Sequence, residues 1–158
     1  MKAATISEMK KDLSSLPSKE LLDLMLKLAK YKKENKELLS YLLYESGDEK
    51  SYIAGIKEEM DLQFNEVNYA SIFYAKKTFR KILRTANKYI RYSGLKTTEI
   101  EVLMYYCKNL KASKIPIHKS PQMINLYQRQ LDKIIKTING LHEDLQFDYQ
   151  EELENLSL

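Results

Sequence analysis

The sequence predicts an all-α protein of six or seven mostly antiparallel helices, arranged in a helical bundle or a short αα-hairpin stack. Apolar residues recur at spacings of three and four along most of the 158 residues, which is the period of an amphipathic helix. No segment alternates apolar and polar residues for long enough to indicate a strand. The four glycines and three prolines stand, apart from Gly55, at the ends of helical patterns or between them. We therefore expect a single all-helical domain over residues 1–158.

The N-terminal part of the chain predicts a short helix followed by a helical hairpin. Residues 5–15 carry a narrow apolar stripe, and residues 18–46 contain two leucine-rich segments. Ser18 is expected to cap the first of these segments, because its hydroxyl can accept a hydrogen bond from a free N–H of the first turn. A break is expected near residues 31–35, with Asn35 capping the second segment. The apolar residues of the first segment spread over about 220°, which predicts contacts on two sides.

Two more helices are bounded by recognisable capping residues. Asp48 is expected to cap a helix that reaches about Val67. Thr98 and Glu101 have the spacing of a capping box, in which each side chain accepts a hydrogen bond from the other residue's backbone N–H. A further helix is therefore expected to begin at Thr98.

The C-terminal part predicts one long helix and a short acidic end. Ser120 precedes Pro121, and this pair is typical of an N-cap followed by the first helical residue. Apolar residues at core spacing continue from there to Asn139. Residues 141–158 are expected to form an acidic C-terminal tail segment.

The longest uninterrupted helical pattern covers residues 69–93, and we expect the rest of the chain to be organised around it. At 100° per residue, its apolar side chains fall on one arc of about 100° that would face a core. No Asp or Glu occurs between Glu66 and Glu99. An adjacent arc of about 100°, called the basic face below, holds six cations: Lys77, Arg80, Lys81, Arg84, Lys88 and Arg91.

Tyr74 and Tyr92 flank the basic face. Lysines and arginines in a row can follow the phosphates of a nucleic acid, and tyrosines can stack on unpaired bases. Together the eight side chains form a candidate anion-binding or nucleic-acid-binding site. Stacking favours single-stranded nucleic acid or RNA over a duplex.

Charge is distributed unevenly along the chain. Residues 67–136 hold 15 Lys or Arg against three Asp or Glu, whereas residues 137–158 hold six Asp or Glu and no Lys or Arg. Such asymmetry is informative about partners. The acidic tail segment is therefore expected to dock on the basic face within one chain. Docking on the basic face of a neighbouring copy, which would give a homo-oligomer, is the alternative.

The sequence gives no positive argument for catalysis. It contains no glycine-rich phosphate loop and no H-E-x-x-H motif. His118 and His142 are isolated from each other, and the single Cys107 stands among apolar neighbours, where a buried, inert thiol is expected. We predict no catalytic residue, no metal site and no cofactor.

The composition indicates a folded globular protein, with 44% hydrophobic and 30% charged residues. No apolar run approaches the roughly 18 to 20 residues needed to cross a bilayer, and the N-terminus has no apolar signal region. We expect a cytoplasmic protein without membrane insertion. The predicted function is a non-catalytic protein–protein interaction or adaptor module with an unidentified protein partner. The alternatives are binding of single-stranded nucleic acid or RNA through the basic face and, third, an enzyme whose site is not visible in the sequence.

Overall fold

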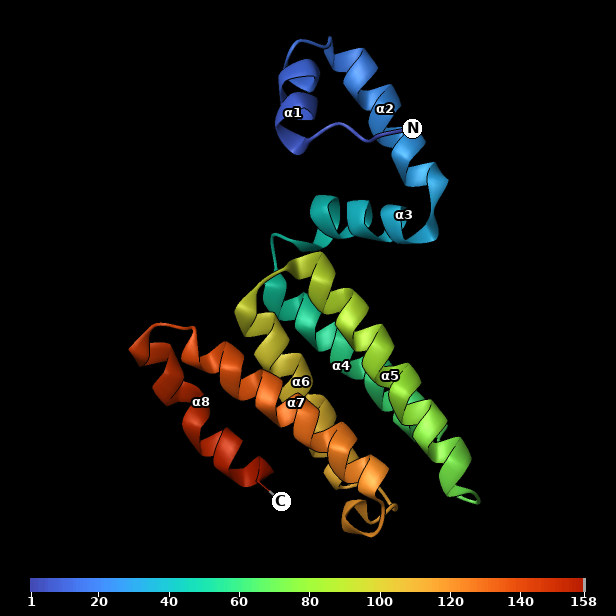
Figure 1. Cartoon of the computed structure of the whole chain (residues 1–158), viewed down its shortest axis with the longest axis vertical. Coiled ribbons are helices and arrows are strands. Elements are labelled where there is room, and N and C mark those ends of the chain that lie inside the picture. The colour runs from blue at the N-terminus through green and yellow to red at the C-terminus, as the bar shows by residue number, and fades with distance from the viewer. Residues whose placement is uncertain (158) are drawn as a thin grey trace. The chain divides into compact units, whose positions relative to one another are not determined.

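The computed structural model describes residues 1–157 and is all-helical, as the sequence predicts (Figure 1). The described residues form eight α-helices and no strand, one helix more than expected, because the acidic tail segment is itself helical. A π-helical turn, η1 (Tyr41–Glu45), and a 3-10 turn, η2 (Ile117–Lys119), add to these. The helices are α1 (Ile6–Ser14), α2 (Ser18–Tyr31), α3 (Lys33–Ser40), α4 (Glu49–Asn65), α5 (Ile72–Ser93), α6 (Lys96–Lys111), α7 (Pro121–Asn139) and α8 (Glu143–Leu156).

The chain divides into two compact units, Met1–Tyr44 and Glu45–Leu158. The first holds α1 to α3, and the second holds α4 to α8. The expectation of one domain over residues 1–158 stays a prediction.

In the first unit, α2 and α3 pack against each other as the predicted hairpin. The break falls at Lys32, whose backbone is extended, and α3 begins one residue later. Two predicted caps are wrong. Ser18 is already the first helical residue of α2, and Pro17 occupies the cap position. Asn35 lies inside α3, and its amide donates a 2.8 Å hydrogen bond across the break to the Leu28 carbonyl, near the end of α2.

The second unit is built around α6, which contacts α4, α5, α7 and α8. The expectation that the basic helix organises the chain is therefore wrong. Apolar side chains point from α6 in nearly every direction, and such a helix is stable only when neighbours cover it on several sides. Its buried residues are Thr98, Ile100, Val102, Leu103, Met104, Tyr106, Cys107 and Leu110.

Helix α5 lies on one side of this core and runs antiparallel to its neighbours α4 and α6 (Figure 1). It begins at Ile72 rather than near Tyr69 and ends, as expected, before Gly94. Gly94 adopts the left-handed conformation, with φ of 69°, which glycine tolerates better than other residues. The residues that α5 buries come from the predicted apolar arc: Ala75, Phe79, Ile82, Ala86 and Ile90.

Of the capping predictions in this unit, the one at Asp48 is confirmed and the one at Thr98 is wrong. Asp48 caps α4, because its carboxylate accepts the Ser51 N–H at 3.1 Å. A hydrogen bond from the Ser51 hydroxyl, together with this one from the backbone, lowers the pKa of Asp48. The capping box of Thr98 and Glu101 is wrong, because α6 begins two residues earlier, at Lys96. Glu101 instead pairs with Lys57 of α4 at 3.3 Å.

Candidate functional site

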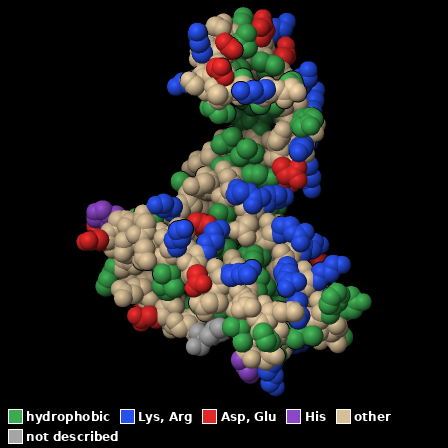
Figure 2. All heavy atoms as spheres, viewed as in Figure 1, with side chains coloured by type: hydrophobic (Ala, Val, Ile, Leu, Met, Phe, Trp, Pro, Cys, Tyr) green, Lys and Arg blue, Asp and Glu red, His purple; other side chains and the backbone are tan. Residues whose placement is uncertain are grey.

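The basic face lies on the side of α5 opposite the buried residues. Along the helix, its six cations are centred about 170° from Ala75, Phe79 and Ile82, each of which is 0% exposed. Lys77, Arg80, Lys81, Arg84 and Arg91 are exposed, and Lys88 is half-buried. The structure therefore brings the predicted cations together on one outward surface. Figure 2 shows a row of Lys and Arg side chains over the place that α5 occupies in Figure 1.

The charge of the basic face is largely uncompensated. Within residues 1–157, no ion pair involves the five exposed cations. Helix α5 itself contains no Asp or Glu. The sixth cation, Lys88, lies 4.8 Å from the centre of the Tyr89 ring. On that flank, Glu45 and Glu59 line a groove together with Tyr89, so carboxylates lie beside this edge of the basic face.

The acidic tail segment does not cover the basic face. It forms α8, which packs on α6 and α7, on the far side of these helices from α5 (Figure 1). The prediction of intramolecular docking on α5 is therefore wrong. Burial of Leu156 anchors the end of α8, whereas Phe147, nearer its start, is 77% exposed.

Hydrogen bonds to backbone carbonyls hold the end of α8. The Tyr127 hydroxyl donates to the Leu156 carbonyl at 2.6 Å. Burial raises the pKa of Tyr127 to about 12, so the phenol keeps the proton that it donates. The Lys111 ammonium donates to the carbonyls of Asn155 and Ser157 at 3.3 and 2.6 Å. The negative end of a helix dipole attracts such a cation.

Aromatic side chains gather at the N-terminal end of the basic face. Tyr74 is 55% exposed and stacks edge-on with Phe73, with the ring centres 5.6 Å apart. Phe73 is 68% exposed and falls on the same arc as the cations. Phe73 is not among the predicted site residues, although its position at 100° per residue places it on the basic face. Tyr92 is half-buried.

The loop before α7 adds one cation near this end. The Lys114 ammonium lies 5.5 Å from the centre of the Tyr69 ring, just before α5 begins. At that distance an ammonium is attracted by the electron-rich face of the ring.

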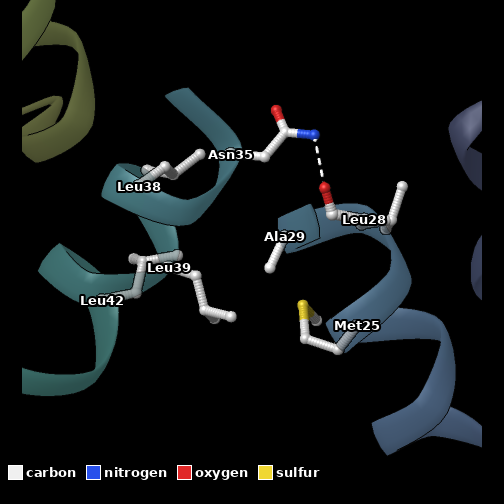
Figure 3. Close-up of a pocket in the computed structure, with 7 residues that line it drawn as sticks. All are labelled: Met25, Leu28, Ala29, Asn35, Leu38, Leu39 and Leu42. Atoms are coloured by element: carbon white, nitrogen blue, oxygen red, sulfur yellow. Dashed lines mark hydrogen bonds between the residues drawn. The ribbon is translucent and has the colours of Figure 1, made fainter. Parts of the chain in front are cut away.

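The first unit presents a different, apolar surface. None of α1, α2 and α3 has a buried residue. Between α2 and α3 lies a groove of about 290 Å³, into which side chains of both helices point (Figure 3). Leu28 and Leu42, at its margin, are 58% and 54% exposed. The lining residues are Met25, Leu28, Ala29, Asn35, Leu38, Leu39 and Leu42.

The two histidines are not brought together. His118 lies in η2, before α7, and His142 follows that helix as the N-cap of α8 (Figure 2, purple). The 19 residues of α7 therefore separate them by a helix about 28 Å long. Among residues 1–157, no three side chains of His, Cys, Asp or Glu are grouped closely enough to hold a metal ion.

Cys107 is buried in the C-terminal half of α6, and burial raises the pKa of its thiol to about 12. Because the thiolate is the nucleophile, we expect the native protein to react with dithionitrobenzoate at pH 8 at least about a thousandfold more slowly than a free thiol. In denaturant the single cysteine should react at the ordinary rate. The absorbance of the released thionitrobenzoate, followed with and without denaturant, measures both rates. Rapid reaction of the folded protein would contradict the burial of Cys107.

Comparisons with known protein families, curated proteins and solved structures found no significant match, so no relative supplies a function. In the described part of the chain, no helix combines the length and the apolar content needed to cross a membrane.

Proposed function

We propose that this chain is a non-catalytic protein-interaction module whose first unit binds an acidic amphipathic helix of a partner protein. The observation that carries the proposal is the exposure of the leucine-rich faces of α2 and α3, neither of which has a buried residue. Contiguous exposed apolar surfaces on soluble proteins mark interaction sites. A segment as short as Met1–Tyr44 also lacks the chain length from which an isolated domain usually builds a core.

The shape of the groove supports a helix as the ligand. Apolar side chains from two helices line it, as in the hydrophobic grooves that receive side chains at positions i, i+3, i+4 and i+7 of a partner helix. Asn35 is the polar exception, and its amide already donates to the Leu28 carbonyl (Figure 3). Covering one fully exposed leucine contributes about 1.5–3 kcal/mol. The leucines of the groove are already partly covered, so several of them together have to offset the entropic cost of association.

The charge around the groove supports an acidic partner. Residues 27–36, from the last turns of α2 through the first turn of α3, contain one Glu and five lysines: Lys27, Lys30, Lys32, Lys33 and Lys36. Lys33 pairs with Glu37 at 3.6 Å in the next turn. Carboxylates beside the apolar stripe of a partner helix would complement the other lysines, speeding association and disfavouring basic competitors.

Two labelled helical peptides with the same leucine stripe test the proposal, one with Glu and the other with Lys at the remaining positions. Fluorescence anisotropy with the full chain should give a Kd on the order of micromolar for the acidic peptide and at least about tenfold weaker binding for the basic one. Leu28→Glu should weaken binding of the acidic peptide about tenfold or more, because it places a negative charge at the margin of the groove, where it repels the acidic peptide. The matched control is Leu62→Glu on α4, where the leucine is 67% exposed.

A further control separates the groove from the basic face, which also attracts acidic peptides. The variant Arg80→Glu/Arg84→Glu/Arg91→Glu should retain binding of the acidic peptide. Equal binding of both peptides, or full binding by the Leu28→Glu protein, would contradict the proposal. Sedimentation equilibrium tests whether a second copy of the chain occupies the groove. Wild-type dimers that the Leu28→Glu substitution dissociates would show this and would contradict the proposal.

A further inference from the structure

We propose that the basic face of α5 is a second, independent binding site, which takes single-stranded nucleic acid. Its cations bind successive phosphates, and Phe73 and Tyr74 stack on bases at one end. This site lies entirely in the unit Glu45–Leu158 and does not depend on the groove of the first unit.

The geometry of the cations fits a phosphate backbone. From Lys77 to Arg91 the helix rises about 21 Å, so the face offers a continuous track and not a single anion site. The helix backbone under the track is ordered, because Ala75, Phe79 and Ile82 on the opposite side of α5 are fully buried. Binding therefore has to order only the cationic side chains and not the helix that carries them.

Five of the six cations form no ion pair within residues 1–157, and this distinguishes the surface from an ordinary charged helix. Many solvated helices alternate lysines with glutamates at positions i and i+4, and the pairs reduce the field. Helix α5 has no carboxylate, and its five exposed cations make no ion pair within residues 1–157. The six carboxylates of residues 137–158 are exposed on α8, which packs on α6 and α7 and not on α5.

The exposed aromatic pair favours a single strand over a duplex. Phe73 and Tyr74 expose 68% and 55% of their surface, although folding usually buries rings of this size. Unpaired bases can stack on such rings, whereas the bases of a duplex are already stacked on one another. Lys114, beside Tyr69, adds a cation near the same end.

The probe is a fluorescein-labelled oligouridylate of about 12 nucleotides, with a duplex of equal length and phosphatidylserine-containing vesicles for comparison. Anisotropy should show binding of the single strand that weakens with salt. About six phosphate contacts give a slope near −4 in log Kobs against log salt concentration. The full chain should bind the duplex and the vesicles more weakly than the single strand.

Matched variants locate the site. Arg80→Glu/Arg84→Glu/Arg91→Glu should weaken binding about 100-fold at low salt and reduce the slope by about 2, because three contacts are lost. The control Lys108→Glu/Arg129→Glu/Lys136→Glu changes net charge equally at exposed positions of α6 and α7 and should keep most of the affinity. Phe73→Ala/Tyr74→Ala should weaken single-strand binding about tenfold, with an unchanged slope. Circular dichroism verifies that each variant is folded.

Three outcomes would overturn the proposal. The first is no binding of the oligonucleotide by the folded protein at low salt, and the second is an equal loss in both charge-reversal variants. The third is tighter binding to vesicles or duplex than to the single strand, which would assign the face to another polyanion. Leu28→Glu should leave oligonucleotide binding intact, so failure of the groove proposal and failure of this one are distinguishable.

Discussion

Leu103→Ala lowers the free energy of unfolding of the second unit by about 3 kcal/mol, the largest effect that we expect from one substitution. Leu103 is 0% exposed on α6, the helix that contacts four neighbours. The truncation removes apolar contacts and leaves a cavity that surrounding helices can fill only in part. The melting temperature should fall by roughly 10 °C.

Urea unfolding followed by circular dichroism measures the loss for Leu103→Ala. The control is Leu62→Ala on α4, because the Leu62 side chain is 67% exposed and its truncation should change stability by no more than about 0.5 kcal/mol. Similar small losses in both variants would show that α6 is not the centre of the core. A lower m-value would indicate instead that the native or unfolded state had changed compactness.

Glu49→Ala is expected to lower the stability of the same unit by about 2 kcal/mol, through hydrogen bonds and not packing. Glu49 lies in the first turn of α4 and accepts hydrogen bonds from the hydroxyls of Ser93 and Thr98, at the end of α5 and the start of α6. One carboxylate therefore ties three helix ends together. Thr98 is 0% exposed, so its hydroxyl would lose its strongest acceptor without gaining water.

A double-mutant cycle with Thr98→Val tests this reason. If the loss of stability comes from the Thr98 hydroxyl left without an acceptor, Glu49→Ala should lower the free energy of unfolding clearly less in the Thr98→Val background than in the wild type. Glu49→Gln, which keeps an acceptor oxygen, should lose less than Glu49→Ala. Full additivity of the two substitutions in urea unfolding would show that Glu49 stabilises the fold by some other route.

The sequence determined the features that depend on short-range physics. Helical periodicity predicted an all-α protein and the hairpin of α2 and α3, and Asp48 and Gly94 marked the start of α4 and the end of α5. The angular positions of the cations placed all six on one face of α5, on an arc adjacent to the apolar arc that would face a core. Phe73 was as accessible to this reasoning as Tyr74, because both positions follow from 100° per residue.

Only the tertiary structure decided how these pieces combine. The charges of the sequence predicted that α8 would cover the basic face. Exposed ion pairs contribute little free energy, however. Burial of Leu156 and the hydrogen bond from the Tyr127 hydroxyl place α8 on α6 and α7 instead. Thr98 had the local spacing of a helix cap, yet its hydroxyl donates a hydrogen bond to the Glu49 carboxylate, 49 residues away in the sequence. Local patterns fix which side chains share a helix face. Which face is covered depends on apolar contacts between distant segments, and these left the basic face of α5 open.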